Sequence, residues 1–212
     1  LGGGQLARML ALSGAPLGLR FLVLDNTSDA CAGQFVPMVV GDYRDENALA
    51  EFASKVDVAT FDFENVPAES AQWLAERIPV FPSPRALAIA QDRLAEKNLF
   101  RELGISVAPF ADISSREDLQ NTIEKIGLPG ILKTRRLGYD GKGQETVNNR
   151  EEALIAFGHF KGEHCVLEQR LTLDYEVSVV LARDEQGKVA CFPTGENQHT
   201  KGILDVSIVP AR

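Results

Sequence analysis

The sequence lacks the cysteine pattern of a disulfide framework or of a zinc site. Its cysteines, Cys31, Cys165 and Cys191, are odd in number and widely spaced, without the short paired spacing of zinc ligands. A reducing, cytoplasmic environment is therefore expected. The sequence also has no apolar run of about 18 residues, the length needed for a membrane span, and no basic-then-apolar leader at its start.

The sequence has no surplus of basic residues. Lys and Arg number 22 against 30 Asp and Glu, which gives a net charge of -8. Such a surface repels both the phosphate backbone of nucleic acids and anionic membranes, so neither is expected as a partner. An anionic small molecule can still bind, because a few focused cations outweigh a diffuse negative field at short range.

The sequence begins without Met and without a strand before its first glycine turn. Leu1 runs directly into Gly2, Gly3 and Gly4, and an apolar helical pattern follows. We therefore expect a truncated N-terminus. The turn is weak evidence for a dinucleotide-binding dehydrogenase, because the following helix lacks the third spaced glycine of that motif.

The first part of the chain alternates strand and helix signals. Apolar strands are predicted at 20–25, 38–41 and 56–63, with helices at 45–54 and 67–77. This alternation predicts a parallel open sheet of Rossmann-like α/β type. Prolines at 79–84 interrupt the pattern, and a domain boundary is expected near 82–92.

The second part has the pattern of an α+β domain. A helix is predicted at 92–104, with Asp92 as N-cap and Gly104 as terminator. A strand at 130–134 and a polar glycine loop follow a helix at 115–126, and another helix is expected at 150–160. Strands at 165–169, 176–183 and 189–192 then begin an antiparallel sheet that looks unfinished.

The most informative stretch is ILKTRRLGYDGKGQ, at 131–144. Lys133 leaves an apolar strand and three glycines follow closely, so an ammonium group and several backbone N–H groups can surround one polyphosphate. The stretch is not a Walker A loop, because no helix-opening Gly-Lys-Ser/Thr follows. The alternative for an isolated glycine loop is a β-hairpin with a solvated basic turn.

Two further stretches carry candidate binding groups. At 166–171 an apolar strand that contains Glu168 runs into a polar connector, and Glu176 follows; these groups could bind adenine and the ribose hydroxyls. The alternative is an exposed Glu on a half-buried strand. Residues 195–204 are predicted to form a polar turn between strands, in which His199 either donates to a phosphate or is simply solvated.

Six segments, taken together, resemble the 5-(carboxyamino)imidazole ribonucleotide synthetase family of the ATP-grasp superfamily in order and spacing. They are LGGGQLARML, TFDFENVP, QDRLAEKNLF, ILKTRRLGYDGKGQ, LEQRLTLDYEVSVV and ENQHTKGILDVSIVPA. The resemblance implies a pre-ATP-grasp domain at 1–86, truncated in its first strand, and an incomplete ATP-grasp domain at 87–212. The chain departs from the family by stopping at Arg212, before the acidic pair that binds magnesium and the basic clamp for the substrate phosphate. No metal ligand is therefore assigned.

The resemblance also implies roles for individual residues. Lys133, Tyr139 and Asp140 would be catalytic. Gln5, Glu64 and Tyr139 would face the ribonucleotide, although Glu64 could be an ordinary carboxylate at a strand end. ATP would contact Arg93, Lys133, Gly138, Tyr139, Asp140, Gly141, Lys142, Gly143, Gln144, Glu168, Gln169, Arg170, Leu171, Glu176 and His199.

The implied activity is that of a ligase of purine biosynthesis. ATP and bicarbonate would form carboxyphosphate, which carboxylates 5-aminoimidazole ribonucleotide, with Mg²⁺ bound beyond Arg212. The protein would be a homodimer, and this chain alone would be inactive. Two alternatives stay open: another ATP-grasp ligase, such as a biotin carboxylase or a formate-dependent glycinamide ribonucleotide transformylase, and a non-catalytic ATP-binding module.

Overall fold

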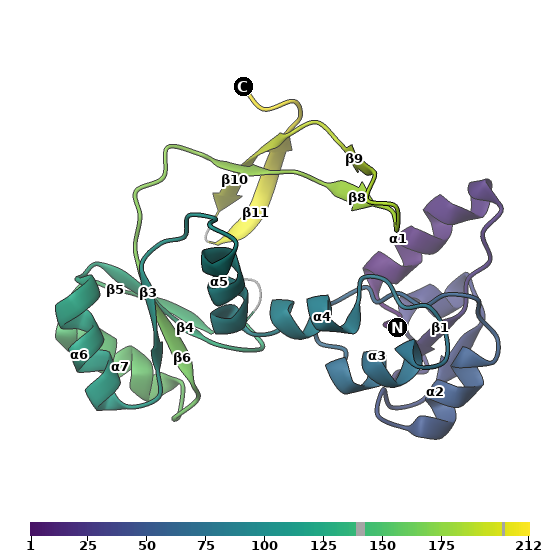
Figure 1. The fold of residues 1–212 in the computed structure, drawn as a ribbon, viewed down its shortest axis with the longest axis horizontal. Coiled ribbons are helices and arrows are strands. Elements are labelled where there is room, and N and C mark those ends of the chain that lie inside the picture. Colours follow the sequence, from purple (N-terminus) through teal and green to yellow (C-terminus); the bar gives the residue numbers. More distant parts are fainter. Residues whose placement is uncertain (139–142, 201) are drawn as a thin grey trace. The chain divides into compact units, whose positions relative to one another are not determined.

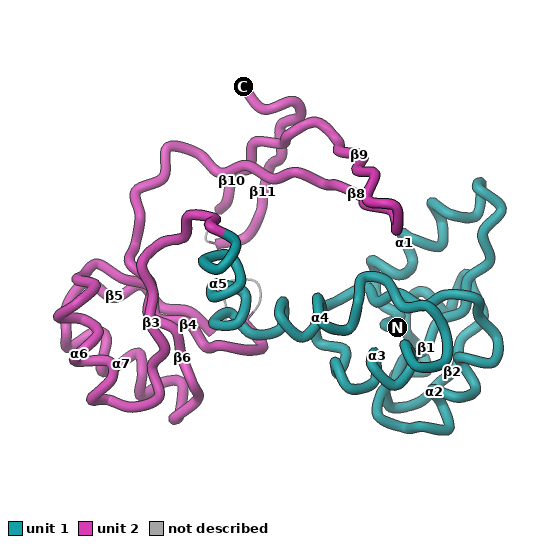
Figure 2. The backbone as a smooth tube through the Cα atoms, in the orientation of Figure 1, with its two compact units in different colours: residues 1–103 teal, residues 104–212 magenta. Residues whose placement is uncertain are grey.

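The computed structural model describes residues 1–138, 143–200 and 202–212. The chain forms two compact units, Leu1–Leu103 and Gly104–Arg212, coloured teal and magenta in Figure 2. Each unit is described by itself. Within the described ranges, no helix has both the length and the apolar composition that crossing a bilayer requires.

Unit 1 is built on parallel backbone segments. Strand β1 (Val23–Asp25) pairs in parallel with β2 (Met38–Val40), and Leu24 lies opposite Val39. The first residues of the chain are hydrogen-bonded on both sides, because the Gly2 N–H donates to the Leu24 carbonyl (3.0 Å) and the Asp62 N–H donates to the Leu1 carbonyl (3.1 Å). The predicted parallel sheet is confirmed, although β1 is shorter than the expected 20–25.

The strand predicted at 56–63 is wrong. Only Ala59 makes a β-bridge there, to Val80 in parallel. The partner segment is flanked by Pro79 and Pro82, which have no N–H to donate, so the ladder cannot extend beyond the bridge. Asp62 consequently lies in a bend after the bridge and Glu64 in a turn.

Helices surround the core of unit 1. Some of them have a side-chain cap from the local sequence: Asp45 accepts from the Asn47 N–H before α2 (Glu46–Ala53), and Asp92 accepts from two N–H groups before α5 (Arg93–Glu102). Two short 3-10 turns, Ala15–Leu17 and Cys31–Gln34, complete the unit. The buried core includes Leu24, Leu49, Val66, Leu74 and Leu87. The α-helices are α1 (Gln5–Gly14), α2 (Glu46–Ala53), α3 (Ala68–Ala75), α4 (Pro84–Ala90) and α5 (Arg93–Glu102).

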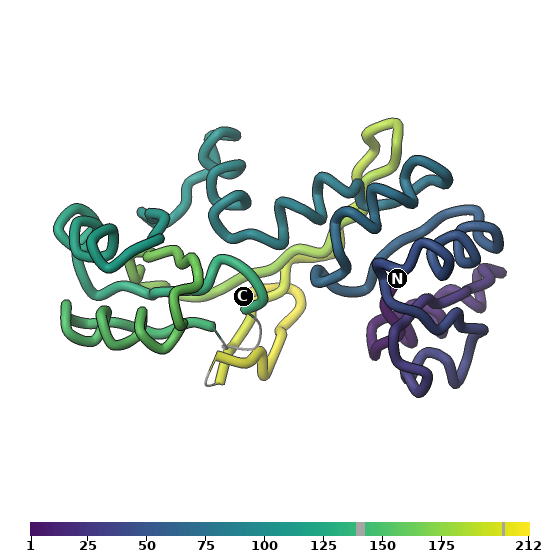
Figure 3. The backbone as a smooth tube through the Cα atoms, turned by 90° about the horizontal axis from the view of Figure 1, so that it is seen from below, coloured from purple at the N-terminus to yellow at the C-terminus, as the bar shows by residue number. Residues whose placement is uncertain are grey.

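Unit 2 contains a four-stranded antiparallel sheet with two helices. The helices α6 (Arg116–Ile126) and α7 (Arg150–His159) lie side by side and pack on the sheet (Figures 1 and 3). Because side chains alternate along a strand, one face buries Leu132 and Leu167 in the core with these helices. The strand order is β3 (Phe110–Ile113), β6 (Cys165–Gln169), β4 (Gly130–Thr134) and β5 (Gln144–Val147). Strand β5 was predicted only by the β-hairpin alternative for the glycine loop.

Two further antiparallel sheets in unit 2, one of two strands and one of three, correct two expectations. Residues 176–183 form two strands, β7 (Glu176–Ser178) and β8 (Leu181–Arg183), and β8 pairs with β9 (Val189–Cys191). The polar turn predicted at 195–204 is instead strand β10 (Gly195–Thr200) and the start of β11 (Ile203–Ile208), in the order β11, β10, β7. Polar side chains on β10 bond across the sheet, which explains why their polarity was mistaken for a turn: Asn197 Oδ1 accepts from Ser207 Oγ at 2.9 Å.

Candidate functional site

Lys133 and Glu168 form an ion pair on the sheet face opposite the core. Lys133 lies opposite Val166 in the register of β4 and β6, so Glu168 is its diagonal neighbour two residues further along β6. The Lys133 Nζ to Glu168 Oε2 distance is 3.0 Å, and the side chains are only 17% and 8% exposed. A largely desolvated ammonium group of this kind forms strong charge-assisted hydrogen bonds with an anionic ligand.

The glycine loop after Lys133 is tied at both ends to Thr134. The Thr134 N–H donates to the Gly143 carbonyl (2.8 Å), and Thr134 Oγ1 donates to the Arg136 carbonyl (3.0 Å). Leu137, in the bend that follows β4, has a φ of 61°, which is unusual for a residue with a side chain. Tyr139, Asp140, Gly141 and Lys142 lie outside the described residues.

Gly143 is required as glycine for two reasons. Its φ is +68°, and a Cβ there would lie 2.6 Å from Thr134 Oγ1. We expect Gly143→Ala to lower the free energy of unfolding by about 1–3 kcal/mol, measured by urea denaturation of the chain. Gly158→Ala is the matched control: a Cβ at this helical glycine meets nothing within 4 Å, so the change should be neutral or stabilising by about 0.5–1 kcal/mol. Equal stability of the two variants would contradict this assignment.

The β-hairpin alternative is correct for the backbone of this segment. Strands β4 and β5 pair antiparallel, with Lys133 opposite Gln144, so the loop joins the two strands of a hairpin. Gln144 is therefore the first residue of β5 rather than part of the loop. A hairpin of this shape is compatible with the predicted phosphate site, because that prediction depends on Lys133 and on backbone N–H groups rather than on the absence of a hairpin.

Glu176 and His199 lie next to each other on the second sheet. Glu176 pairs with Asn197 in register, and His199 follows two residues later along β10, after a β-bulge between Gln198 and His199. His199 Nδ1 is 2.5 Å from Glu176 Oε2, and the two side chains are 37% and 47% exposed. The structure thus brings together two residues that the sequence assigned separately.

The connector after β6 is held by backbone hydrogen bonds. The Gln169 N–H donates to the Pro109 carbonyl (2.9 Å), and the Arg170 N–H donates to the Pro129 carbonyl (3.0 Å). Leu171, the next residue, is 49% exposed. These two bonds fix the path of the chain immediately after Glu168, while the N–H groups of Gln169 and Arg170 are already used within the protein.

The remaining predicted residues lie in unit 1. Gln5 is the exposed first residue of α1, and Arg93 is the first residue of α5. Glu64 lies in a turn rather than at a strand end, and its carbonyl accepts from Gln91 Nε2 at 2.5 Å. Gln91 also donates to the Val66 carbonyl (2.5 Å), and it is buried at the end of α4. Sequence reasoning missed Gln91 as a support of the Glu64 turn. A polar residue directly after an apolar helix is only a weak signal for a buried side chain that binds backbone carbonyls.

Two aspartates beside the first glycine turn were also missed. Asp25 Oδ2 accepts from the Gly3 N–H (2.7 Å) and from the Tyr43 hydroxyl (2.9 Å). Burial raises the pKa of Asp25, but hydrogen bonds from Thr27, Gly3 and Tyr43 outweigh it and hold that pKa below its usual value. Burial raises the pKa of Asp62.

The described residues do not fit a magnesium site. Across residues 1–138, 143–200 and 202–212, no three His, Cys, Asp or Glu side chains gather in a way that would hold a metal ion. The acceptor oxygens that Mg²⁺ requires are therefore not assembled in this part of the chain.

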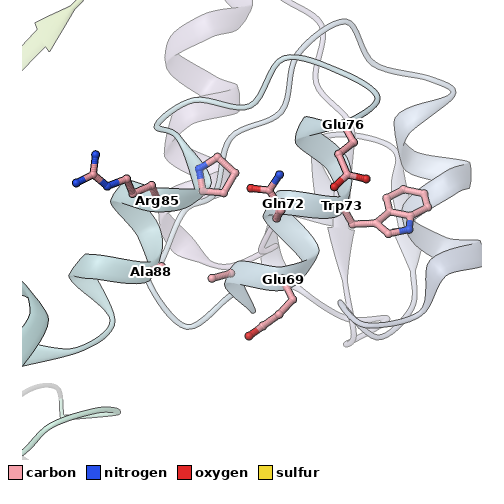
Figure 4. Close-up of a pocket in the computed structure, with 8 residues that line it drawn as sticks. Glu69, Gln72, Trp73, Glu76, Arg85 and Ala88 are labelled. Carbon is pink, nitrogen blue, oxygen red and sulfur yellow. The ribbon is translucent and has the colours of Figure 1, made fainter.

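An open groove of about 480 Å³ lies between α3 and α4, and none of the predicted site residues lines it. Figure 4 shows its side chains, with Arg85 and Trp73 at opposite ends of the view. The groove is shallow and its polar lining includes Glu69 and Glu76, which would repel a nucleotide phosphate. It is therefore a poor candidate for an ATP site.

Family models match both parts of the chain. Residues 1–91 match the model of the ribonucleotide synthetase preATP-grasp domain, and residues 98–212 match that of the ATP-grasp domain. The N5-carboxyaminoimidazole ribonucleotide synthase of Pseudomonas aeruginosa is 44% identical over 208 residues, which are 98% of this chain and 58% of that protein.

Solved structures of similar enzymes have the same fold. The N5-carboxyaminoimidazole ribonucleotide synthetase of Thermus thermophilus is 47% identical with a TM-score of 0.92, over 99% of this chain and 57% of that one. An Aspergillus clavatus N5-carboxyaminoimidazole synthase in complex with ADP and 5-aminoimidazole ribonucleotide is 26% identical with a TM-score of 0.89, over 100% of this chain and 56% of that one. The chain thus spans less than three-fifths of the relatives it matches. Because the ATP-grasp model covers more than half of its residues, the chain belongs to the ATP-grasp family.

Proposed function

We propose that this chain carries the ATP-binding part of a ligase that carboxylates 5-aminoimidazole ribonucleotide with ATP and bicarbonate, in purine biosynthesis. The observation that carries the proposal is the largely buried Lys133–Glu168 pair on the sheet face opposite the unit 2 core, with Lys133 placed just before the glycine loop. Family membership and the names of the similar proteins support it. The proposed functional division is 1–86 for the pre-ATP-grasp domain and 87–212 for the ATP-grasp domain.

The proposed roles follow from the chemistry of each group. Lys133, Arg93 and His199 neutralise phosphate oxygens, and backbone N–H groups of the glycine loop cover the β and γ phosphates. Glu176 holds the ribose hydroxyls, and Glu168 with the connector faces the base. The full proposed ATP set is Arg93, Lys133, Gly138, Tyr139, Asp140, Gly141, Lys142, Gly143, Gln144, Glu168, Gln169, Arg170, Leu171, Glu176 and His199.

Lys133, Tyr139 and Asp140 are the proposed catalytic residues, and Gln5, Glu64 and Tyr139 contact the ribonucleotide. A bicarbonate oxygen attacks the γ-phosphorus, and the bond to the departing ADP breaks. The resulting carboxyphosphate releases carbon dioxide and phosphate, and the exocyclic amine attacks the carbon dioxide and loses a proton. The protein contributes positioning, charge neutralisation and exclusion of water, since carboxyphosphate is readily hydrolysed.

Magnesium, when bound, would supply positive charge that offsets the negative charge of the triphosphate. The described residues assemble no group of three His, Cys, Asp or Glu side chains that would hold it. We accordingly expect the isolated chain to bind ATP without turning it over at the rate of the complete protein. From the family resemblance we also propose a cytoplasmic homodimer.

The test is ATP hydrolysis by the complete protein with bicarbonate and candidate acceptors. We expect 5-aminoimidazole ribonucleotide to stimulate ADP formation at least tenfold, because an ordered acceptor site excludes water and commits carboxyphosphate to transfer. Biotin, and glycinamide ribonucleotide with formate, serve as matched controls. Stimulation by either control alone would instead favour another ATP-grasp ligase, and ATP binding without any turnover would favour a non-catalytic module.

A further inference from the structure

Two aspartates hold the first glycine turn of unit 1 from different sides. Asp25, at the end of β1, accepts the Gly3 N–H at 2.7 Å and is itself held by the Tyr43 hydroxyl at 2.9 Å. Asp62 lies 55 residues away from Ala7 in the sequence and accepts the Ala7 N–H at 3.2 Å. Neither carboxylate belongs to the groups assigned above to ATP or to the ribonucleotide.

Asp62 acts as the missing N-cap of α1. The N-cap position is Gly4, which has no side chain, and the first turn of α1 contains no acidic residue. By contrast α2, α5, α6 and α7 are each capped by the side chain of their own N-cap residue, Asp45, Asp92, Ser115 and Asn149. A helix N-terminus is normally a binding site for an anion, and here the protein fills it with its own carboxylate.

The glycines of the turn pack directly against the two aspartates. Gly2 has a φ of +95°, and a Cβ there would lie 1.6 Å from Asp62 Oδ1. A Cβ on Gly3 would lie 3.1 Å from the Asp25 Cβ and 2.8 Å from the Ala30 Cβ. The turn therefore has no room for a side chain at Gly2 or Gly3 beside the two aspartates.

Asp62 also connects two segments that the proposed function uses. It holds the first turn of α1, where Gln5 is the first residue, and it precedes Glu64 by two residues in the chain. The Glu64 turn is held from its other side by Gln91. Loss of the Asp62 carboxylate would release the first turn of α1 and loosen one support of the Glu64 turn.

We propose that Asp25 and Asp62 are positioning residues for the ribonucleotide, fixing the segments that carry Gln5 and Glu64. The proposal rests on the proposed function. It also implies that the ribonucleotide phosphate does not bind at the N-terminus of α1, because Asp62 already accepts hydrogen bonds there and repels a second anion.

The test compares steady-state kinetics of Asp62→Ala, Asp62→Asn and Asp45→Ala in the complete protein. We expect Asp62→Ala to raise the KM for 5-aminoimidazole ribonucleotide about tenfold, with the KM for ATP within twofold, since small misplacements of positioning groups have large effects. Asp62→Asn keeps an acceptor oxygen for the Ala7 N–H and should restore most of the loss. Asp45→Ala removes a helix cap of the same residue type in the same unit, and should leave both KM values unchanged.

Amide hydrogen exchange of residues 5–8 supplies a second readout: Asp62→Ala should speed exchange there, and Asp62→Asn should not.

If Asp62→Ala does not fold, Tyr43→Phe tests the Asp25 side, with an expected rise of about threefold in the ribonucleotide KM alone. An unchanged ribonucleotide KM in a folded Asp62→Ala variant, or in Tyr43→Phe, would overturn the proposal. Absence of ribonucleotide-dependent turnover in the unmodified protein would instead overturn the proposed function.

Discussion

Replacing Lys133 by alanine is expected to weaken ATP binding to this chain by roughly 100-fold. A hydrogen bond to a charged group contributes about 1.5–3 kcal/mol, and each 1.4 kcal/mol is a factor of ten in affinity. The substitution also leaves the Glu168 carboxylate, only 8% exposed, without its ammonium partner at 3.0 Å. That carboxylate would then repel the phosphates, so the loss adds to that of the hydrogen bond. Isothermal titration calorimetry of the chain with ATP measures the change.

Two further variants separate charge from folding. Lys125→Ala removes an exposed lysine in the last turn of α6, in the same unit, and should leave ATP affinity unchanged. Lys133→Ala combined with Glu168→Gln removes the repelling carboxylate and should recover part of the affinity. A dissociation constant for Lys133→Ala equal to that of the unmodified chain would remove Lys133 from the nucleotide site.

Replacing Glu176 by alanine should remove the preference for ATP over 2′-deoxyATP. If Glu176 accepts from the ribose hydroxyls, the unmodified chain should bind ATP about tenfold more tightly than the 2′-deoxy analogue, which lacks one donor. Because Glu176 is about half exposed, each contact is expected to contribute about 1–1.4 kcal/mol, so the loss of both should weaken ATP binding by about 2–2.8 kcal/mol, roughly 30- to 100-fold. Competition with a fluorescent ATP analogue gives both affinities.

His199 provides the matched control for Glu176, because the two side chains are in contact. His199→Ala removes a proposed phosphate ligand, so it should weaken ATP and 2′-deoxyATP by the same factor. A Glu176→Ala variant that keeps the original ratio of the two affinities would show that the carboxylate does not hold the ribose.

The helices of this chain were predictable because their signals are local. Asp92 and Gly104 bracket α5, as the sequence indicated, and the helix predicted at 115–126 is α6, with Ser115 as its cap. Each cap depends on residues two to four positions apart, so no knowledge of the tertiary fold is needed. The alternation of strand and helix likewise predicted the parallel β1–β2 pair.

The strands that were missed or misplaced depend on partners far away in the sequence. β10 has polar side chains on both faces and is stabilised across the sheet by Glu176 and Ser207, so its own sequence resembles a turn. The strand expected at 56–63 is reduced to the single bridge at Ala59, because its partner segment is limited by prolines about twenty residues further along the chain. The local sequence of β10 and of residues 56–63 carries no information about the distant segments with which they pair.

The candidate site was predictable in part for the same reason. The glycine loop and Lys133 are adjacent in sequence, and their association needs no fold. The pairing of Lys133 with Glu168, 35 residues away, depends on the register of β4 and β6. The capping of α1 by Asp62 and the support of Glu64 by Gln91 are also long-range contacts, and no spacing rule indicates them.

Hydrogen exchange of the chain with and without ATP, read by mass spectrometry, tests nucleotide binding in unit 2 most directly. We expect ATP to slow exchange in peptides that cover the backbone on either side of the glycine loop, at 134–138 and 143–147, and in the connector at 168–172. Lys133→Ala should abolish this protection. Unchanged exchange in these peptides at saturating ATP, with protection only in α3 and α4, which line the groove that contains Trp73, would contradict nucleotide binding in unit 2.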